Sequence, residues 1–126
     1  MVNVGAKEMI IKDFRDLKIW QRSISLAKIV YDLIQSLPKD EAYGISSQIR
    51  RSAVSVSSNI AEGFARQYNK EYKQYLFIAL GSCAELITQL TIASEVGLTK
   101  TEKTSDIIGE IEETSKMIMS LIKKFK

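Results

Sequence analysis

Nucleophilic side chains gather in one stretch of the 126-residue chain, yet the residues that would activate them are missing. Six serines lie between positions 46 and 58, but none stands in a G-x-S-x-G motif, and no lysine occurs between Asp40 and Gln67. The chain contains no histidine, which excludes Ser-His and Cys-His pairs and imidazole acid–base catalysis. We therefore expect that the protein is not an enzyme.

Carboxylates and the single cysteine give no metal site. Glu110, Glu112 and Glu113 fall opposite the apolar positions of their segment, whereas a di-metal bundle site needs inward glutamates and a Glu-x-x-His motif. Cys83 occupies an apolar position, where an inert buried thiol is expected. We expect no metal and no cofactor. Glu85 differs because it stands among apolar residues, so we expect it to pair with an arginine at a helix–helix or subunit contact.

Basic residues offer a different chemistry, the binding of RNA or DNA. The candidates for nucleic-acid binding lie close together in the sequence: Arg50, Arg51, Arg66, Lys70 and Lys73. Such side chains contact phosphates, and bases would stack on Tyr68 or Tyr72. The net charge of +3 is compatible with this function but does not diagnose it. Salt bridges to Asp40, Glu41, Glu62 or Glu71 would use the same basic residues, so both interpretations stay open.

Four apolar patterns with helical spacing must position these residues. The third is the most regular, with steps of three and four in strict alternation from Tyr72 to Ala93. The first carries two parallel rows. The rows of the first pattern are Leu17, Trp20, Ile24, Ala27, Tyr31 and Ile34, and beside them Leu26, Val30, Leu33 and Leu37. The second pattern is Ile45, Ile49, Val56, Ile60 and Phe64, with Ser52 or Ala53 in the gap. The third is Tyr72, Leu76, Ala79, Cys83, Leu86, Leu90 and Ala93, and the fourth is Ile108, Ile111, Ser115, Ile118, Ile122 and Phe125. Short connections predict an all-α, up-down-up-down four-helix bundle.

Punctuating residues set the expected helix ends. Asp13 or Asp16 is the predicted N-cap of the first helix, and Pro38 stops it. Asn69 is predicted to cap the third helix, which ends at a left-handed Gly97. Thr99 and Glu102 have capping-box spacing for the fourth. Residues 1–12 lack a clear period and are predicted to form a flexible tail before a bundle domain of residues 13–126.

The second helix is unusual because serine and alanine surround its apolar row. Serine is a mediocre helix former, so these small side chains predict close packing on more than one side. Asn59 in mid-helix needs hydrogen-bond partners if it is buried. Gly63 marks either a close contact or the start of unwinding, and the sequence does not decide between them.

Features that would direct the chain elsewhere in the cell are not apparent. No signal-peptide core precedes Lys12, and the longest apolar run, residues 76–80, is far too short to span a membrane. One cysteine allows no internal disulfide, which suits a reducing compartment. We expect a cytoplasmic protein without a membrane partner.

Several of these stretches together resemble the 23S rRNA-intervening-sequence protein family, also called four helix bundle protein. Residues 14–21 resemble its F-x-D-L-x-x-W-Q opening, and residues 58–63 match its S-N-I-A-E-G block. Residues 37–41, 43–53, 70–72 and 78–86 extend the likeness, which runs from about Phe14 to Gly97. Ser57 and Cys83 depart from the usual family residues, and the fourth helix matches only in pattern.

The resemblance implies a ring-shaped homopentamer. Some family members are encoded within insertions of bacterial 23S rRNA genes, and a related branch of retroelement accessory proteins binds a reverse transcriptase and nucleic acid. For this chain it implies self-association, with RNA, DNA, a reverse transcriptase or another protein as further partners. The expected oligomer interface consists of Gln48, Asn59, Ala61, Glu62 and Gly63. The alternative function is a protein-interaction scaffold or adaptor that binds no nucleic acid directly.

Overall fold

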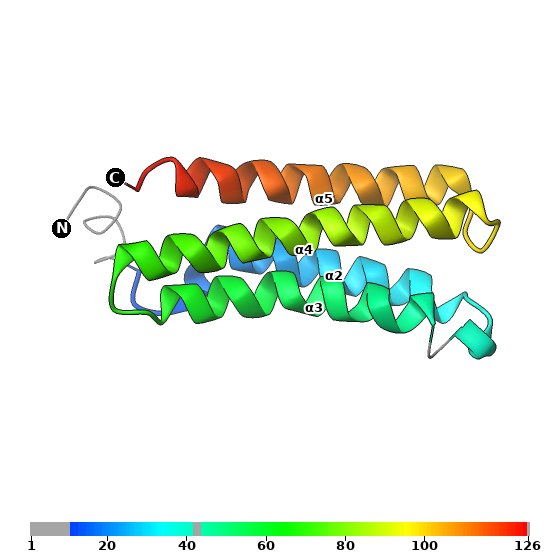
Figure 1. Cartoon of the computed structure of the whole chain (residues 1–126), viewed down its shortest axis with the longest axis horizontal. Helices are drawn as coiled ribbons and strands as arrows, with labels where there is room; N and C mark the ends of the chain where they lie inside the picture. The colour runs from blue at the N-terminus through cyan, green and yellow to red at the C-terminus, as the bar shows by residue number, and fades with distance from the viewer. Residues whose placement is uncertain (1–10, 42–43, 126) are drawn as a thin grey trace.

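The computed structural model describes residues 11–41 and 44–125 as four long antiparallel helices (Figure 1). Two short 3-10 turns, η1 and η2, precede and follow the first long helix. The elements are η1 (Phe14–Asp16), α2 (Lys18–Gln35), η2 (Lys39–Glu41), α3 (Ile45–Phe64), α4 (Asn69–Glu95) and α5 (Thr101–Ile122). No strand occurs in the described ranges. The predicted all-α, up-down-up-down bundle is confirmed.

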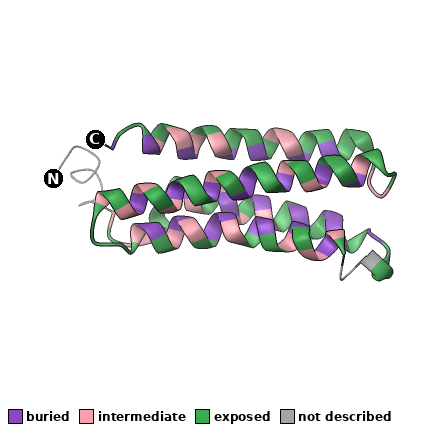
Figure 2. Ribbon diagram, in the orientation of Figure 1, coloured by how far each residue is buried: buried purple, intermediate pink, exposed green. Residues whose placement is uncertain are grey.

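The core lies along the facing rows of the four helices, where the purple segments of Figure 2 meet. The row predicted on α4 is confirmed, since every member from Tyr72 to Ala93 is buried. On α3, Ile49, Val56 and Ile60 are buried, and Ser52 and Ala53 both fill the gap. The row on α5 is shifted: Ile107 and Thr114 are buried, whereas Ile108 and Ser115 are only half-buried.

The two apolar rows on α2 differ in how deeply they are buried. Leu26, Val30, Leu33 and Leu37 are buried as predicted. The middle of the other row, from Trp20 to Tyr31, is half-buried or exposed, although Trp20 and Ala27 pack partly against the core. Part of a row with core-like spacing therefore reaches the surface of the bundle.

Helix ends depart from the predicted caps in three places. Asp13 caps η1 rather than α2, accepting a hydrogen bond from the Arg15 amide at 2.9 Å, and Asp16 lies within η1. Tyr68, not Asn69, is the N-cap of α4. Thr99 and Glu102 form no capping box, because α5 begins after Lys100 and the Thr99 hydroxyl hydrogen-bonds the Thr104 hydroxyl at 2.8 Å.

The predicted C-terminal cap of α4 is confirmed. Gly97 has a φ of +84°, the left-handed conformation that glycine adopts without strain. The Leu98 amide donates to the Ala93 carbonyl at 2.8 Å, and the Gly97 amide donates to the Ser94 carbonyl at 3.1 Å. These two bonds form a Schellman motif. At the same end of the bundle, α2 stops at Gln35, before Pro38 (Figure 1). Most of the predicted tail, residues 1–10, lies outside the described residues.

Candidate nucleic-acid and assembly surfaces

The structure separates the predicted nucleic-acid residues into two groups. Arg50 and Arg51 lie in the first half of α3, whereas Arg66, Lys70 and Lys73 surround the turn into α4. Sixteen residues of nearly continuous helix separate Arg50 from Arg66, which amounts to about 24 Å at the α-helical rise. A single patch that contains all five side chains is therefore not formed within one chain.

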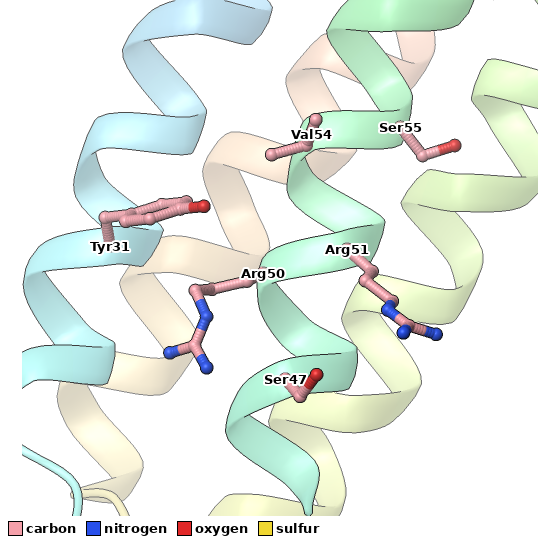
Figure 3. A pocket seen from close by; sticks show the side chains of 6 residues that line it. All are labelled: Tyr31, Ser47, Arg50, Arg51, Val54 and Ser55. Carbon is pink, nitrogen blue, oxygen red and sulfur yellow. The ribbon is translucent and has the colours of Figure 1, made fainter. Parts of the chain in front are cut away.

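Arg50 and Arg51 flank α3 on opposite sides (Figure 3). A hollow of about 410 Å³ between α2 and α3 is lined by both arginines together with Tyr31, Ser47, Val54 and Ser55. Arg50 extends toward the α2 side and Arg51 toward α4. The spacing of Tyr31 predicts a core position, but its side chain is 39% exposed and lines this hollow with Arg50.

Arg51 lines a second, polar hollow of about 310 Å³ between α3 and α4. Glu85 and Gln89 of α4 line the same hollow, with Gln48, Ser52 and Ser55 of α3. The expected arginine neighbour of Glu85 is therefore in place. Within the described part of the chain, however, the two charged groups do not approach within ion-pair distance. The Gln89 Oε1 atom is buried there, and no described residue hydrogen-bonds it.

Arg66 is engaged within the chain rather than extended toward solvent. Its guanidinium donates to Glu62 Oε2 at 2.8 Å, as the i, i+4 spacing predicts. It also hydrogen-bonds the Tyr75 hydroxyl, and it lies 4.7 Å from the centre of the Tyr75 ring. These contacts connect the end of α3 to the start of α4, so the Arg66 side chain stabilises the turn and is not directed toward a phosphate ligand.

The remaining basic residues of this turn lie at the end of the bundle that also carries the C-terminus (Figure 1). Tyr68 is 61% exposed, whereas Tyr72 is buried and cannot stack on a base. The rings of Tyr72 and Phe125 meet at 5.2 Å, which brings the end of α5 to the start of α4. Lys123 and Lys124 follow α5, where positive charge also interacts favourably with the helix dipole. We define the basic end as the set of five residues Tyr68, Lys70, Lys73, Lys123 and Lys124.

Four of the five predicted interface residues reach the surface of α3. Gln48 and Glu62 are exposed, and Asn59 and Ala61 are half-buried. The Asn59 amide donates to the Ser55 carbonyl at 2.8 Å and to the Ser55 hydroxyl at 2.9 Å. Gly63 is different, because it is buried beneath Tyr72 and Tyr75 of the same chain. Its close contact is with α4, so it is not available to a neighbouring subunit.

Two apolar surfaces accompany these polar groups. The α2–α3 groove, a hollow of about 290 Å³, is lined by Trp20, Ile24, Ala27, Val54, Ser57, Ser58 and Ala61. The outer face of α4 carries exposed Phe77, Ile78 and Ile92. Among the described helices α4 is also the one long and apolar enough to cross a membrane by length and composition, a property that core helices of bundles share.

Among the described residues, no arrangement of side chains indicates metal binding or catalysis. No group of three metal-ligating side chains occurs among them. Cys83 is buried, and this burial raises the pKa of its thiol, with a weaker opposing effect from the Ser115 hydrogen bond. The Arg15 hydrogen bonds lower the pKa of Asp13 to about 2 on the surface. Neither group is poised for catalysis, because a catalytic pKa lies near neutral pH.

Comparison with known proteins gives one family and one fold. The family model of the 23S rRNA-intervening sequence protein matches residues 15–120. A solved structure from Bacteroides thetaiotaomicron, described as a protein of unknown function from the S23 ribosomal protein family, is 25% identical. The alignment covers 83% of this chain and 98% of that one, with a TM-score of 0.78. No curated protein matches the chain.

Proposed function

Because the chain belongs to the 23S rRNA-intervening sequence protein family, we propose that it is a non-enzymatic, cytoplasmic homo-oligomer that binds RNA or DNA at its basic end. A pentamer is the assembly that the resemblance implies. A reverse transcriptase or another protein is a further candidate partner. Arg50 and Arg51 lie far from the basic end along α3, and Arg66 is engaged by Glu62, so the proposed nucleic-acid surface is narrower than the sequence indicated.

The observation that carries this proposal is an exposed aromatic ring among lysines from two helices. Tyr68 precedes Lys70 and Lys73 on one side, and the Tyr72–Phe125 contact places Lys123 and Lys124 nearby. Lysines neutralise phosphates without reading sequence, and an exposed ring stacks on any base. In a cyclic assembly, the copies would present these ends together and raise the local density of positive charge.

Binding of a fluorescent single-stranded RNA, measured by anisotropy at several salt concentrations, tests the proposal. We expect affinity to fall steeply with salt, and a variant with all four lysines changed to Gln to show a shallower dependence. The logarithmic slope should drop by about 0.7 for each phosphate that is no longer neutralised. Tyr68→Ala should weaken binding by about 1–3 kcal/mol for a stacked base.

The matched control carries Lys100→Gln and Lys103→Gln, two exposed lysines at the opposite end of the bundle. This control should bind RNA as the wild type does. Absence of binding to both RNA and single-stranded DNA at low salt would sink the proposal, as would an equal loss of affinity in the control.

The second candidate function is a protein-interaction scaffold or adaptor without nucleic-acid binding. Exposed Phe77, Ile78, Ile92 and Val96 favour it, since apolar side chains suit a protein surface better than a phosphate backbone. In that case the lysine variant would leave capture of the protein partner unchanged, and no RNA would be bound.

A further inference from the structure

We infer that the outer face of α4 from one copy packs into the α2–α3 groove of a second copy, so that one interface joins two different surfaces of the same chain. This inference rests on the proposed self-association and adds to it which surfaces meet and in what register. The occupant of the groove is a second copy of this chain, rather than an unrelated helix, because the chain itself carries the complementary surface at the matching height.

The receiving surface is the outer row of α2, whose apolar residues repeat with the spacing of a helix–helix seam. Trp20, Ile24 and Ala27 follow this spacing but are only half-buried in their own chain, where Trp20 and Ala27 pack partly against the core. On the α3 side the groove is lined by Val54, which is 46% exposed, and by small side chains such as Ala61. Small side chains let the backbone of a further helix approach closely.

The inserting surface is the outer face of α4. Phe77 and Ile78 are 48% and 50% exposed, and Ile92 extends the apolar surface toward the far end of the helix. Gly81 lies between them, and a Cβ built there would meet nothing within 4 Å in its own chain. Glycine in a helix interior costs about 0.5–1 kcal/mol relative to alanine. A neighbouring helix that passes close to Gly81 supplies a reason for this cost.

Two hydrogen bonds fix the heights of these surfaces along the bundle. The Ser55–Ser82 bond at 2.8 Å sets α3 against α4, and the Ser57–Ser23 bond at 2.9 Å sets α3 against α2. The helices are antiparallel with the same rise per residue, so counting outward from these bonds places Trp20, Ile60 and Phe77 at one height. Ile78 comes level with Asn59.

Copies related by rotation about an axis parallel to the bundle keep every residue at its own height. Phe77 and Ile78 of one copy therefore reach Trp20 and Ala61 of the next without any shift along the axis. The same count brings Glu85 level with Ser52, next to Arg50 and Arg51. Arg50 lies on the α2 side of α3 and shares the adjoining hollow with Val54, so the Glu85 carboxylate on the inserting face comes close in height to an arginine beside the groove, and the interface is complementary in charge as well as in shape.

Mixing two variants tests the inference directly. Ile78→Asp damages the inserting face but leaves the groove intact, and Val54→Asp does the reverse. We expect each variant alone to be a monomer by light scattering, whereas the wild type is an oligomer. An equimolar mixture should form a one-to-one heterodimer, because one undamaged groove can still receive one undamaged α4 face. Ala61→Leu, which fills the groove without adding charge, should also abolish the wild-type assembly.

Trp20, the only tryptophan, reports on the groove independently. Its fluorescence should shift to shorter wavelength when the Ile78→Asp and Val54→Asp variants are mixed. Ile29→Asp is the matched control: Ile29 is exposed at 37% on α2 but does not line the groove, so this variant should assemble as the wild type does. Circular dichroism and urea unfolding verify that each variant is folded.

The outcomes separate this inference from the function on which it rests. If the wild type is an oligomer and both face variants assemble normally, the pairing is wrong and the proposed assembly stands. If one variant assembles alone and the mixture yields no heterodimer, the contact joins identical surfaces and the inference is overturned. A monomeric wild type overturns both the inference and the homo-oligomer.

Discussion

At the scale of single residues, Gly63 sets the distance between α3 and α4. A Cβ built at this position would lie 2.7 Å from the Tyr75 Cβ and 3.2 Å from the Tyr72 carbonyl oxygen. Neither atom is the far end of a flexible side chain, so the two helices would have to separate. The sequence left Gly63 open between a close contact and an unwound end, and the structure shows the close contact.

Gly63→Ala should therefore destabilise the bundle by about 1–3 kcal/mol, the usual cost of overpacking. Gly109→Ala is its control, since a Cβ at Gly109 meets nothing within 4 Å on α5. That control should be neutral or slightly stabilising, because alanine is the better helix former. Urea unfolding followed by circular dichroism measures both. Equal stability of the two variants would contradict the close contact.

The basic residues illustrate at the same scale how one residue type takes different roles. Arg66 combines an ion pair to Glu62 with a ring contact to Tyr75, and Arg22 pairs with Glu110 of α5 at 2.9 Å. These exposed pairs contribute little to stability individually. They do, however, engage two arginines within the chain, so we expect phosphate contacts from the lysines of the basic end.

At the scale of elements, the end of α4 depends on backbone geometry rather than on side-chain contacts. Gly97 adopts a φ of +84°, and no heavy atom lies within 4 Å of a Cβ built there. Gly97→Ala should therefore lower the free energy of unfolding by about 1–2 kcal/mol through backbone strain alone. Urea unfolding measures this loss. A variant as stable as the wild type would mean that α4 does not end in the left-handed conformation.

Helix α2 carries two apolar rows, and only one of them is buried along its whole length. The buried row from Leu26 to Leu37 packs against the other helices, and the outer row from Trp20 to Tyr31 forms part of the α2–α3 groove. Helix α4 similarly has a buried row and an apolar outer face. A helix that is apolar on two sides buries both only when other helices pack on each side, and within this bundle the other helices fully bury one side only.

At the scale of the whole molecule, assembly and stability become linked. If copies associate only when folded, dilution should lower the unfolding midpoint of the wild type, because mass action favours the dissociated state. Ile78→Asp should remove this concentration dependence, whereas Ile29→Asp should retain it. Thermal unfolding at protein concentrations that span two orders of magnitude would measure the effect. A wild-type midpoint independent of concentration would argue against coupled folding and assembly.

The sequence by itself determined the helices, their order and most of the core. The rows on α3 and α4 were predictable because burial in a bundle imposes a period of 3.6 residues, which the chain displays directly. The Schellman motif at Gly97 was predictable because glycine is the residue that adopts positive φ without strain. The Glu62–Arg66 pair followed from i, i+4 spacing. All of these features depend on neighbours within a few residues.

Only the tertiary structure decided which of two rows is buried, which basic residues share a surface and what Gly63 contacts. Periodicity shows that Trp20, Ile24 and Ala27 share one face of α2, but it cannot show whether another helix of the same chain covers that face. The distance between Arg50 and Lys70, and the meeting of Tyr72 with Phe125, likewise depend on how antiparallel helices are set against one another. That register comes from contacts between residues far apart in the chain, such as Ser55 with Ser82, which no local pattern records.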